Sequence, residues 1–336
     1  MENVIKKVGW MMVFCLIILC LGVRSPEVLG AEITLRFAGN LPIGHHNTRG
    51  QEFYSKLIME RTHNRVKVEV FPAGQLFSDK DLMKALPSGA VDMALTHPSW
   101  WTGINPLELL LDLPFVYDDL SHYHRVLDTK AGEILKQEME EKIGVKFLYW
   151  CDYETIEISS RVPLKTLEDF KGKRIRAPGE MTGEAIRALG ASPTALGGGE
   201  VYMAFQRGII EGTTTGVTSI WERKYIEVAK YLIVAHLSYS TFPVRINKKK
   251  WDGLPKDVQK IMLEAAIEAQ EWGRKEAQKM AKETLETLTH KGLDVYKPPE
   301  SEMKKWREAS KPCVELFLKR AGEKGKVLLE LVDKVR

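Results

Sequence analysis

The chain has 336 residues, of which 44% are hydrophobic and 28% are charged, a length and composition that suit two globular lobes. Its 49 Lys and Arg residues nearly balance its 45 Asp and Glu residues. The net charge of +4 is too small to predict a nucleic-acid partner. Four cysteines are also too few for a disulfide framework.

Residues 1–31 have the pattern of a cleaved signal peptide. Lys6 and Lys7 precede an apolar run at residues 8–23, and small residues at 28–31 offer a cleavage site. A retained anchor is the alternative, but a spanning helix needs about 20 apolar residues and this run is shorter. We therefore expect a periplasmic protein.

Only Cys151 and Cys313 remain after signal cleavage, because Cys15 and Cys20 lie within the predicted signal. In an oxidising compartment the two could pair. Two separate buried thiols are the slightly favoured interpretation.

Strands and helices alternate from the start of the mature sequence. Strands are predicted at residues 33–37, 66–71 and 91–96. Between them, one helix is predicted around 53–58, and a second helix begins at a capping box formed by Ser78. A second series follows, with strands at 145–150, 155–159, 173–177 and 209–210 and helices at 182–189 and 200–206. This βα order predicts parallel strands covered by helices, the α/β class.

The last third of the sequence is helical. Apolar residues recur with a period near 3.6 over residues 257–288, which predicts a helix of about 46 Å. That length exceeds one small lobe, so the helix is expected to run across two. Further helices are predicted at 300–321 and 324–335.

Signals for catalysis and for metal binding are weak. The glycines at 197–199 lack the Lys and Ser/Thr of a phosphate-binding loop, and nothing near Cys151 supports a nucleophile. The histidine pairs, His45 with His46 and His122 with His124, have no further ligands at zinc spacing. We interpret them as surface or turn residues, and we expect no metal and no cofactor.

Candidate ligand-binding residues lie at strand ends. His97, Trp100 and Trp101 follow the strand at 91–96, and ligands of open α/β sheets bind beyond the carboxyl ends of strands. Arg176 lies on the short strand that Pro178 ends. An arginine on a rigid strand can bind a carboxylate through two parallel hydrogen bonds.

Three longer segments resemble one family. Residues 171–178 (KGKRIRAP), 188–194 (ALGASPT) and 200–212 (EVYMAFQRGIIEG) are similar to solute receptors of tripartite ATP-independent periplasmic (TRAP) transporters of the DctP type. Residues 65–76 (RVKVEVFPAGQL), together with the LPF and WxxLP motifs near 113 and 251, agree in order. The resemblance covers nearly the whole mature chain.

The resemblance implies a two-lobed clamshell of the periplasmic-binding-protein type (type II-like), with a long helix spanning both lobes. We expect lobe I at residues 32–153 and 242–272 and lobe II at 154–241. The C-terminal helices, 273–336, are expected to pack on both lobes. Such a receptor binds a small organic acid and delivers it to the TRAP membrane subunits, without catalysis.

The same resemblance implies the binding residues. Arg176 is expected to bind the ligand carboxylate, with Thr215 taking the position where many relatives have Asn or an aromatic residue. Thr214, His97, Trp100, Asn40, Thr155 and Trp150 complete the expected pocket. A second arginine of some relatives falls near Thr155 and is missing, and an aromatic wall near Gly198 is missing too.

These departures favour a monocarboxylate with a sizeable, partly apolar or aromatic body. The missing arginine argues against a dicarboxylate, and Gly198 is expected to leave more room. Three alternatives stay open at this point. They are a receptor for an ABC-type transporter, an extracytoplasmic sensor partner and a secreted enzyme that uses Cys151.

Overall fold

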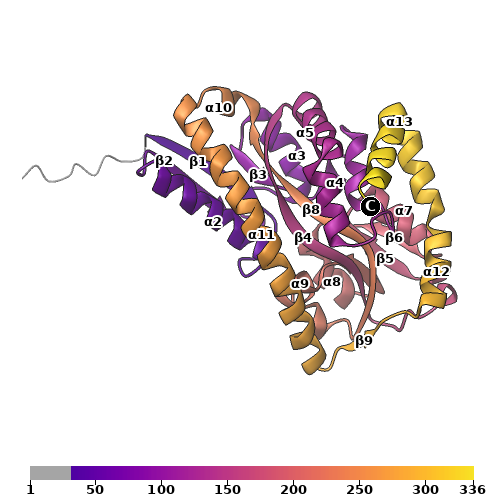
Figure 1. Cartoon of the computed structure of the whole chain (residues 1–336). Helices are drawn as coiled ribbons and strands as arrows, with labels where there is room; N and C mark the ends of the chain where they lie inside the picture. Colours follow the sequence, from indigo (N-terminus) through magenta and orange to yellow (C-terminus); the bar gives the residue numbers. More distant parts are fainter. Residues whose placement is uncertain (1–31) are drawn as a thin grey trace, which may run out of the picture.

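The computed structural model describes residues 32–336, and the predicted signal peptide lies outside the described residues. One mixed sheet forms the centre of the molecule (Figure 1), with strand order β2-β1-β3-β8-β4-β7-β5-β6 and β9 paired to β8. The strands are β1 (Ile33–Gly39), β2 (Val66–Phe71), β3 (Met93–Leu95), β4 (Val145–Ser160), β5 (Arg174–Ala177), β6 (Ser192–Ala195), β7 (Gly212–Thr215), β8 (Tyr231–Asn247) and β9 (Asp294–Tyr296).

Helices cover both faces of this sheet. The longer helices are α2 (His46–Arg61), α3 (Asp79–Ser88), α4 (Leu120–Asp128), α5 (Lys130–Ile143), α7 (Glu180–Ala188), α11 (Lys256–His290), α12 (Glu300–Ala309) and α13 (Lys311–Lys334). The shorter ones are α6 (Leu167–Phe170), α8 (Val201–Gln206), α9 (Val217–Glu222) and α10 (Lys248–Asp252). Among residues 32–336, no helix is both long and apolar enough to cross a membrane.

Two long antiparallel strands join the two halves of the sheet. β4 and β8 pair from Val145 opposite Asn247 to Ser160 opposite Tyr231, with register shifts on the way. β3 pairs with one end of this ribbon, and β1 and β2 continue from it in parallel. β7 pairs with the other end, and β5 and β6 follow. Two βα units at opposite ends of one ribbon form the two lobes, which confirms the expected fold class.

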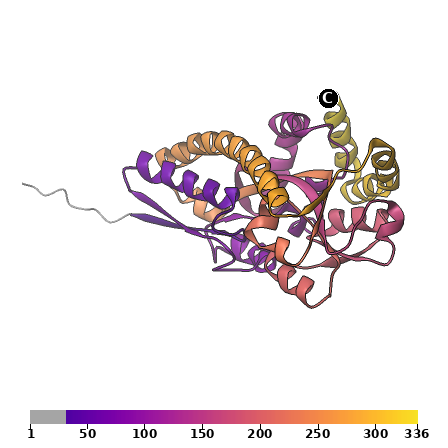
Figure 2. The ribbon, with the colours of Figure 1, turned by 90° about the horizontal axis from the view of Figure 1, so that it is seen from below.

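The long helix α11 packs against both lobes. Val258, Met262 and Ala269 belong to the apolar core around β1 and α2, whereas Leu288 belongs to the core around α8 and α9. At 1.5 Å per residue its 35 residues span about 52 Å. Figure 2 shows the helix curving alongside α2. The prediction of a helix that crosses both lobes is therefore confirmed.

Several predicted elements differ from those in the structure. The strands expected at 145–150 and 155–159 are one strand, β4, and the strand expected at 209–210 begins only at Gly212. Asp152 and Glu154, which lie between the two predicted strands, are both buried and hydrogen-bonded within β4. The final helices divide at Ser310, and α13 is broken at Gly322, where φ is +61°.

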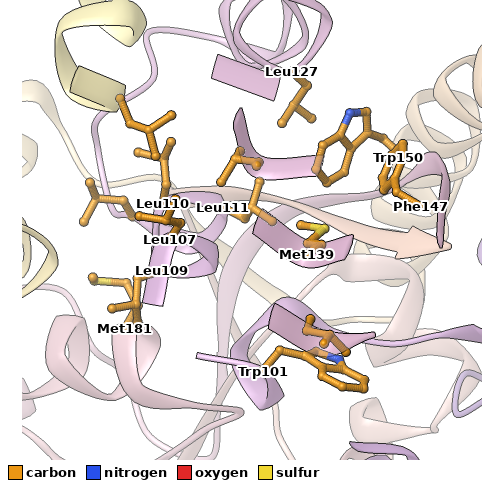
Figure 3. Packing of buried hydrophobic residues seen from close by; sticks show 14 of the residues in the cluster. Trp101, Leu107, Leu109, Leu110, Leu111, Leu127, Met139, Phe147, Trp150 and Met181 are labelled. Carbon is orange, nitrogen blue, oxygen red and sulfur yellow. The ribbon is translucent and has the colours of Figure 1, made fainter. Parts of the chain in front are cut away.

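Two tryptophans of the expected pocket belong to the apolar core of lobe I instead. Trp101 and Trp150 are fully buried among leucines, and Figure 3 shows Trp150 beside Phe147, with ring centroids 4.5 Å apart. The indole Nε1–H of Trp101 donates to Thr96 Oγ1 at 2.8 Å. Both residues stabilise the lobe rather than form a ligand wall.

Candidate functional site

A cavity lies between the two lobes, where the carboxyl ends of β5 and β7 face the loops that follow β1 and β3. It contains about 560 Å³ of space outside protein atoms, part of it open to solvent. The polar lining consists of Asn40, Asp79, His97, Tyr153, Arg176, Thr182, Thr214, Thr215, Ser219, Arg223 and Tyr225. Leu41, Trp100, Ile156, Pro178, Gly198 and Phe242 complete it.

Arg176 is positioned by β5 and is only 7% exposed. Its Nε donates to Leu196 O at 2.9 Å and its Nη1 to Thr214 O at 3.3 Å. Within the described residues these bonds use two of the five guanidinium N–H groups, so three remain for a ligand. Burial lowers the pKa of Arg176, although the group stays charged at neutral pH.

A second arginine enters the cavity from the turn after α9. Arg223 Nη2 donates to Asn40 O at 2.8 Å, which links lobe II to lobe I. A Cβ at Gly198 would lie 3.0 Å from Arg223 Nη2, so the absence of a side chain there makes room for the guanidinium. The expectation that Gly198 leaves extra room is therefore wrong, because Arg223 occupies that space. Arg223 is thus a second arginine of the cavity, although it does not stand at the position near Thr155.

Asp79 brings a negative charge to the same cavity from the first turn of α3. Burial raises the pKa of this carboxyl, and the positive charges of Arg223 and Arg176 act in the opposite direction. In the sequence, this segment is recognisable only as the start of a helix. No local pattern distinguishes an N-terminal helix carboxylate that caps its helix from one that faces a ligand.

His97 forms part of the opposite wall. Its Nδ1 accepts a hydrogen bond from Ser99 N at 3.1 Å, so the neutral ring has its proton on Nε2, 3.6 Å from Asp112 Oδ1. Burial lowers the pKa of His97 despite the nearby Asp112 carboxylate. The ring packs edge-on against Phe242, with centroids 4.9 Å apart. A neutral His97 offers shape and one weak donor rather than a positive charge.

A hydroxyl-rich wall completes the cavity. Tyr153 Oη lies 2.9 Å from Thr215 Oγ1 and donates to Ser219 Oγ at 2.6 Å. Thr214 Oγ1 donates to Arg176 O at 3.2 Å, which connects β7 to β5. Tyr225 Oη donates to Gly198 O at 2.9 Å. These bonds hold the side chains in fixed orientations, which favours selective binding of a polar ligand.

The structure brings most of the expected site residues together. Arg176, Thr214, Thr215, His97, Trp100 and Asn40 all line the cavity. Thr155 and Trp150 do not line it, which corrects the expected pocket. Thr155 is partly buried on β4, whereas Tyr153 and Ile156 of the same strand line the cavity, because register shifts in β4 interrupt the strict alternation of its faces. Trp150 points into the core, as Figure 3 shows.

The four histidines, which were expected at the surface or in turns, are largely buried. His45, His46 and His122 are almost completely buried, and His124 Nε2 lies 2.5 Å from Asp152 Oδ2. His45 caps α2 by accepting a hydrogen bond from Asn47 N. Burial, the largest cause, lowers the pKa of His46 to about 4, so the ring is neutral at pH 7.

Both remaining cysteines are free and buried, as favoured from the sequence. Burial raises the pKa of Cys151 and of Cys313 to about 12. A thiol with such a pKa is almost never a thiolate at neutral pH, which argues against a nucleophilic role for Cys151.

Comparisons with known proteins agree with this geometry. Residues 37–320 match the family described as bacterial extracellular solute-binding protein, family 7 (DctP). The chain belongs to this family.

Among its relatives is the 2,3-diketo-L-gulonate-binding periplasmic protein YiaO of Escherichia coli, 30% identical over 96% of this chain and 98% of that protein. A TRAP periplasmic solute-binding protein of Sulfurospirillum deleyianum, solved with bound succinate, has a TM-score of 0.85 and 29% identity. That match covers 91% of this chain and all of the other. A Desulfovibrio salexigens homologue with bound orotic acid has a TM-score of 0.86 and 26% identity, covering 90% of this chain and 98% of the other.

Membership of the DctP family makes this chain an extracytoplasmic solute receptor of a TRAP transporter. Family members are binding proteins rather than enzymes, and the solved relatives hold small organic acids. The resemblance seen in residues 171–178 and 200–212 is thereby confirmed.

Proposed function

We propose that this receptor binds a small organic acid in the cavity between its lobes, with Arg176 and Arg223 as the two cationic contacts. The single observation that carries the proposal is the set of guanidinium N–H groups that protein acceptors leave unused in a largely buried cavity. Charge-assisted hydrogen bonds from arginine to a carboxylate are among the strongest polar contacts in proteins.

The charges in the cavity favour a ligand with one carboxylate. Arg176 and Arg223 contribute two positive charges, Asp79 contributes one negative charge when it is ionised, and the lowered pKa of His97 favours its neutral ring. The net charge of about +1 is balanced by a single carboxylate. The preference for a monocarboxylate therefore rests on this charge balance and not on the missing arginine near Thr155.

Asp79 also favours a hydroxylated ligand body over an aromatic one. A partly buried carboxylate needs hydrogen-bond donors, and ligand hydroxyl groups can supply them. Trp100 provides one apolar wall, whereas Trp101 and Trp150 are committed to the core. A sugar acid fits this arrangement, and the relative named for 2,3-diketo-L-gulonate supports the same class.

Binding is proposed to stabilise the closed arrangement of the lobes. Arg223 already donates to Asn40 across the cleft, and a Cβ at Gly179 would lie 2.2 Å from Ser99 Cβ, so the lobes approach closely on both sides. A ligand that contacts both lobes favours the closed state by its differential affinity. The hinge is proposed to lie in β4 and β8, between lobe I (32–153, 242–272) and lobe II (154–241).

The closed receptor is then proposed to deliver its acid to the TRAP membrane subunits from the periplasm, after removal of the signal peptide. No chemical step on the ligand is part of this function. The helices at 273–336 are proposed to pack on both lobes and so to follow the closure.

Isothermal titration calorimetry on the mature protein, refolded to remove co-purified ligand, tests the proposal. The acids are gluconate, succinate and benzoate, which differ in hydroxyl groups, in charge and in aromatic character. We expect gluconate to bind tightest, and Asp79→Asn to reduce its advantage over benzoate. Tightest binding of succinate would refute the charge argument, and binding of benzoate alone would refute the role of Asp79. If the cavity bound no organic acid in a wider panel, the receptor assignment for this cavity would be wrong.

A further inference from the structure

A buried cluster behind the ligand cavity consists of His45, His46 and Glu154. One ring nitrogen of each histidine and one oxygen of Glu154 lie within 4.8 Å of one another. Within residues 32–336, no other three His, Cys, Asp or Glu side chains meet at this spacing. The cluster is separated from the cavity by Tyr153, whose ring stacks on His45 with centroids 5.3 Å apart.

Each histidine has one nitrogen occupied and one without a partner. His46 Nε2 donates to Tyr153 O at 2.5 Å, which leaves Nδ1 as a buried lone pair with no hydrogen-bond partner in the described chain. His45 Nδ1 accepts from Asn47 N at 3.2 Å, and its Nε2 has no partner there either. Buried polar atoms without partners are uncommon in native proteins, and a bound ion or water molecule is one explanation for them.

The Glu154 carboxylate is held in place for such a ligand. Its two oxygens accept hydrogen bonds from Val217 N and Thr218 N at the start of α9, each at 3.0 Å. A carboxylate oxygen can accept more than one contact, so both keep free lone pairs. A side chain at Gly216 would collide with Glu154, because its Cβ would lie 2.2 Å from the carboxylate. The glycine therefore allows the carboxylate to reach the cluster.

We propose that His45, His46 and Glu154 bind a divalent zinc ion when the lobes are closed. Two imidazoles and one carboxylate are a ligand set that zinc commonly takes, with a fourth position open. His46 has the usual outer-shell contact of a metal ligand, since its other nitrogen donates to a backbone carbonyl. His45 binds the zinc ion through Nε2, and its long hydrogen bond from Asn47 N is then lost.

The three ligands come from both sides of the hinge. The histidines begin α2 of lobe I, whereas Glu154 anchors the start of α9 in lobe II. Opening of the cleft gives the ion a route to the site, and closure completes the ligand set. Zinc bound in this way stabilises the closed state and, by linkage, strengthens binding of the acid.

The direct test is zinc binding by the chelator-treated mature protein, followed by calorimetry and by the visible absorption of the Co²⁺ form. We expect one equivalent of zinc per chain and a Co²⁺ spectrum of low coordination number. His46→Gln is expected to weaken zinc binding by at least about 100-fold, because loss of outer contacts alone costs 10- to 100-fold. His63→Gln, an exposed histidine elsewhere on lobe I, is the matched control and should bind like wild type.

Thermal melting of each variant shows whether it is folded, and zinc should raise the Tm of wild type and of His63→Gln only. X-ray absorption of the zinc-loaded wild type gives a readout that needs no variant, and two imidazole ligands are expected. Less than one equivalent of zinc, a metal shell without imidazole, or equal affinity in His46→Gln would overturn the proposal. The cluster would then hold a buried water molecule. One donor, His45 Nε2, and two acceptors, His46 Nδ1 and the Glu154 carboxylate, also suit a water.

Discussion

Replacement of Arg176 by alanine tests the most specific part of the proposed site. A bound carboxylate can accept two charge-assisted hydrogen bonds from the N–H groups that Leu196 O and Thr214 O leave free. Each such bond contributes about 1.5–3 kcal/mol. Truncation of one side of a buried charge pair costs about 2–5 kcal/mol. We therefore expect Arg176→Ala to lose about 3–5 kcal/mol of binding free energy, which corresponds to a rise in Kd of about 100- to 5,000-fold.

Calorimetric titration of a tight-binding acid into wild type and Arg176→Ala measures this loss. Arg174→Ala is the matched control, because Arg174 lies two residues earlier on the same strand and forms an exposed ion pair with Glu211. An exposed pair contributes about 0–1 kcal/mol to stability and nothing to the cavity. If Arg176→Ala is folded and its Kd stays within about threefold of wild type, Arg176 does not bind the ligand and the reasoning fails.

Three further predictions follow from other contacts. Arg223→Gln removes a cavity charge and the bond across the cleft, so calorimetry should show about 10-fold or greater weakening; an unchanged Kd would exclude Arg223 from binding. A thiol reagent should modify neither Cys151 nor Cys313 in the folded protein, and it should modify both after unfolding without reductant. If the two cysteines formed a disulfide, neither would react after unfolding. The hydrogen bond to Glu157 raises the pKa of His236, so its contribution to stability is complete below about pH 6.5 and is lost as pH rises through the raised pKa. Denaturant unfolding across that window should show this fall in wild type, and an equal fall in His236→Gln would contradict it.

Contacts far apart in the sequence explain why the site was only partly predictable. Arg176 could be recognised because a strand and Pro178 hold it at a strand end, and such a pattern is local. Arg223 meets Asn40, a residue 183 positions away, only because the lobes close on each other. Nothing in the sequence around Arg223 distinguishes it from an exposed helix residue.

The two buried carboxylates of β4 show the same limit for the fold. Asp152 and Glu154 lie between the strands predicted at 145–150 and 155–159, and charged residues are rarely buried without partners. Their partners, His124 and the start of α9, come from other elements. The sequence indicates that burial of a charge is unfavourable, but it does not indicate which distant residue pairs with that charge.

By itself, the sequence determined the features that depend on neighbouring residues: the βα alternation, the long helix predicted at 257–288 and the arginine of β5. Hydrophobic periodicity and turn chemistry are local, so these features can be read along the chain. Only the tertiary structure decided that Trp150 faces the core, that Gly198 makes room for Arg223, and that His45 and His46 meet Glu154. These outcomes depend on strand facing and lobe closure, because they bring together side chains from segments that the sequence keeps far apart.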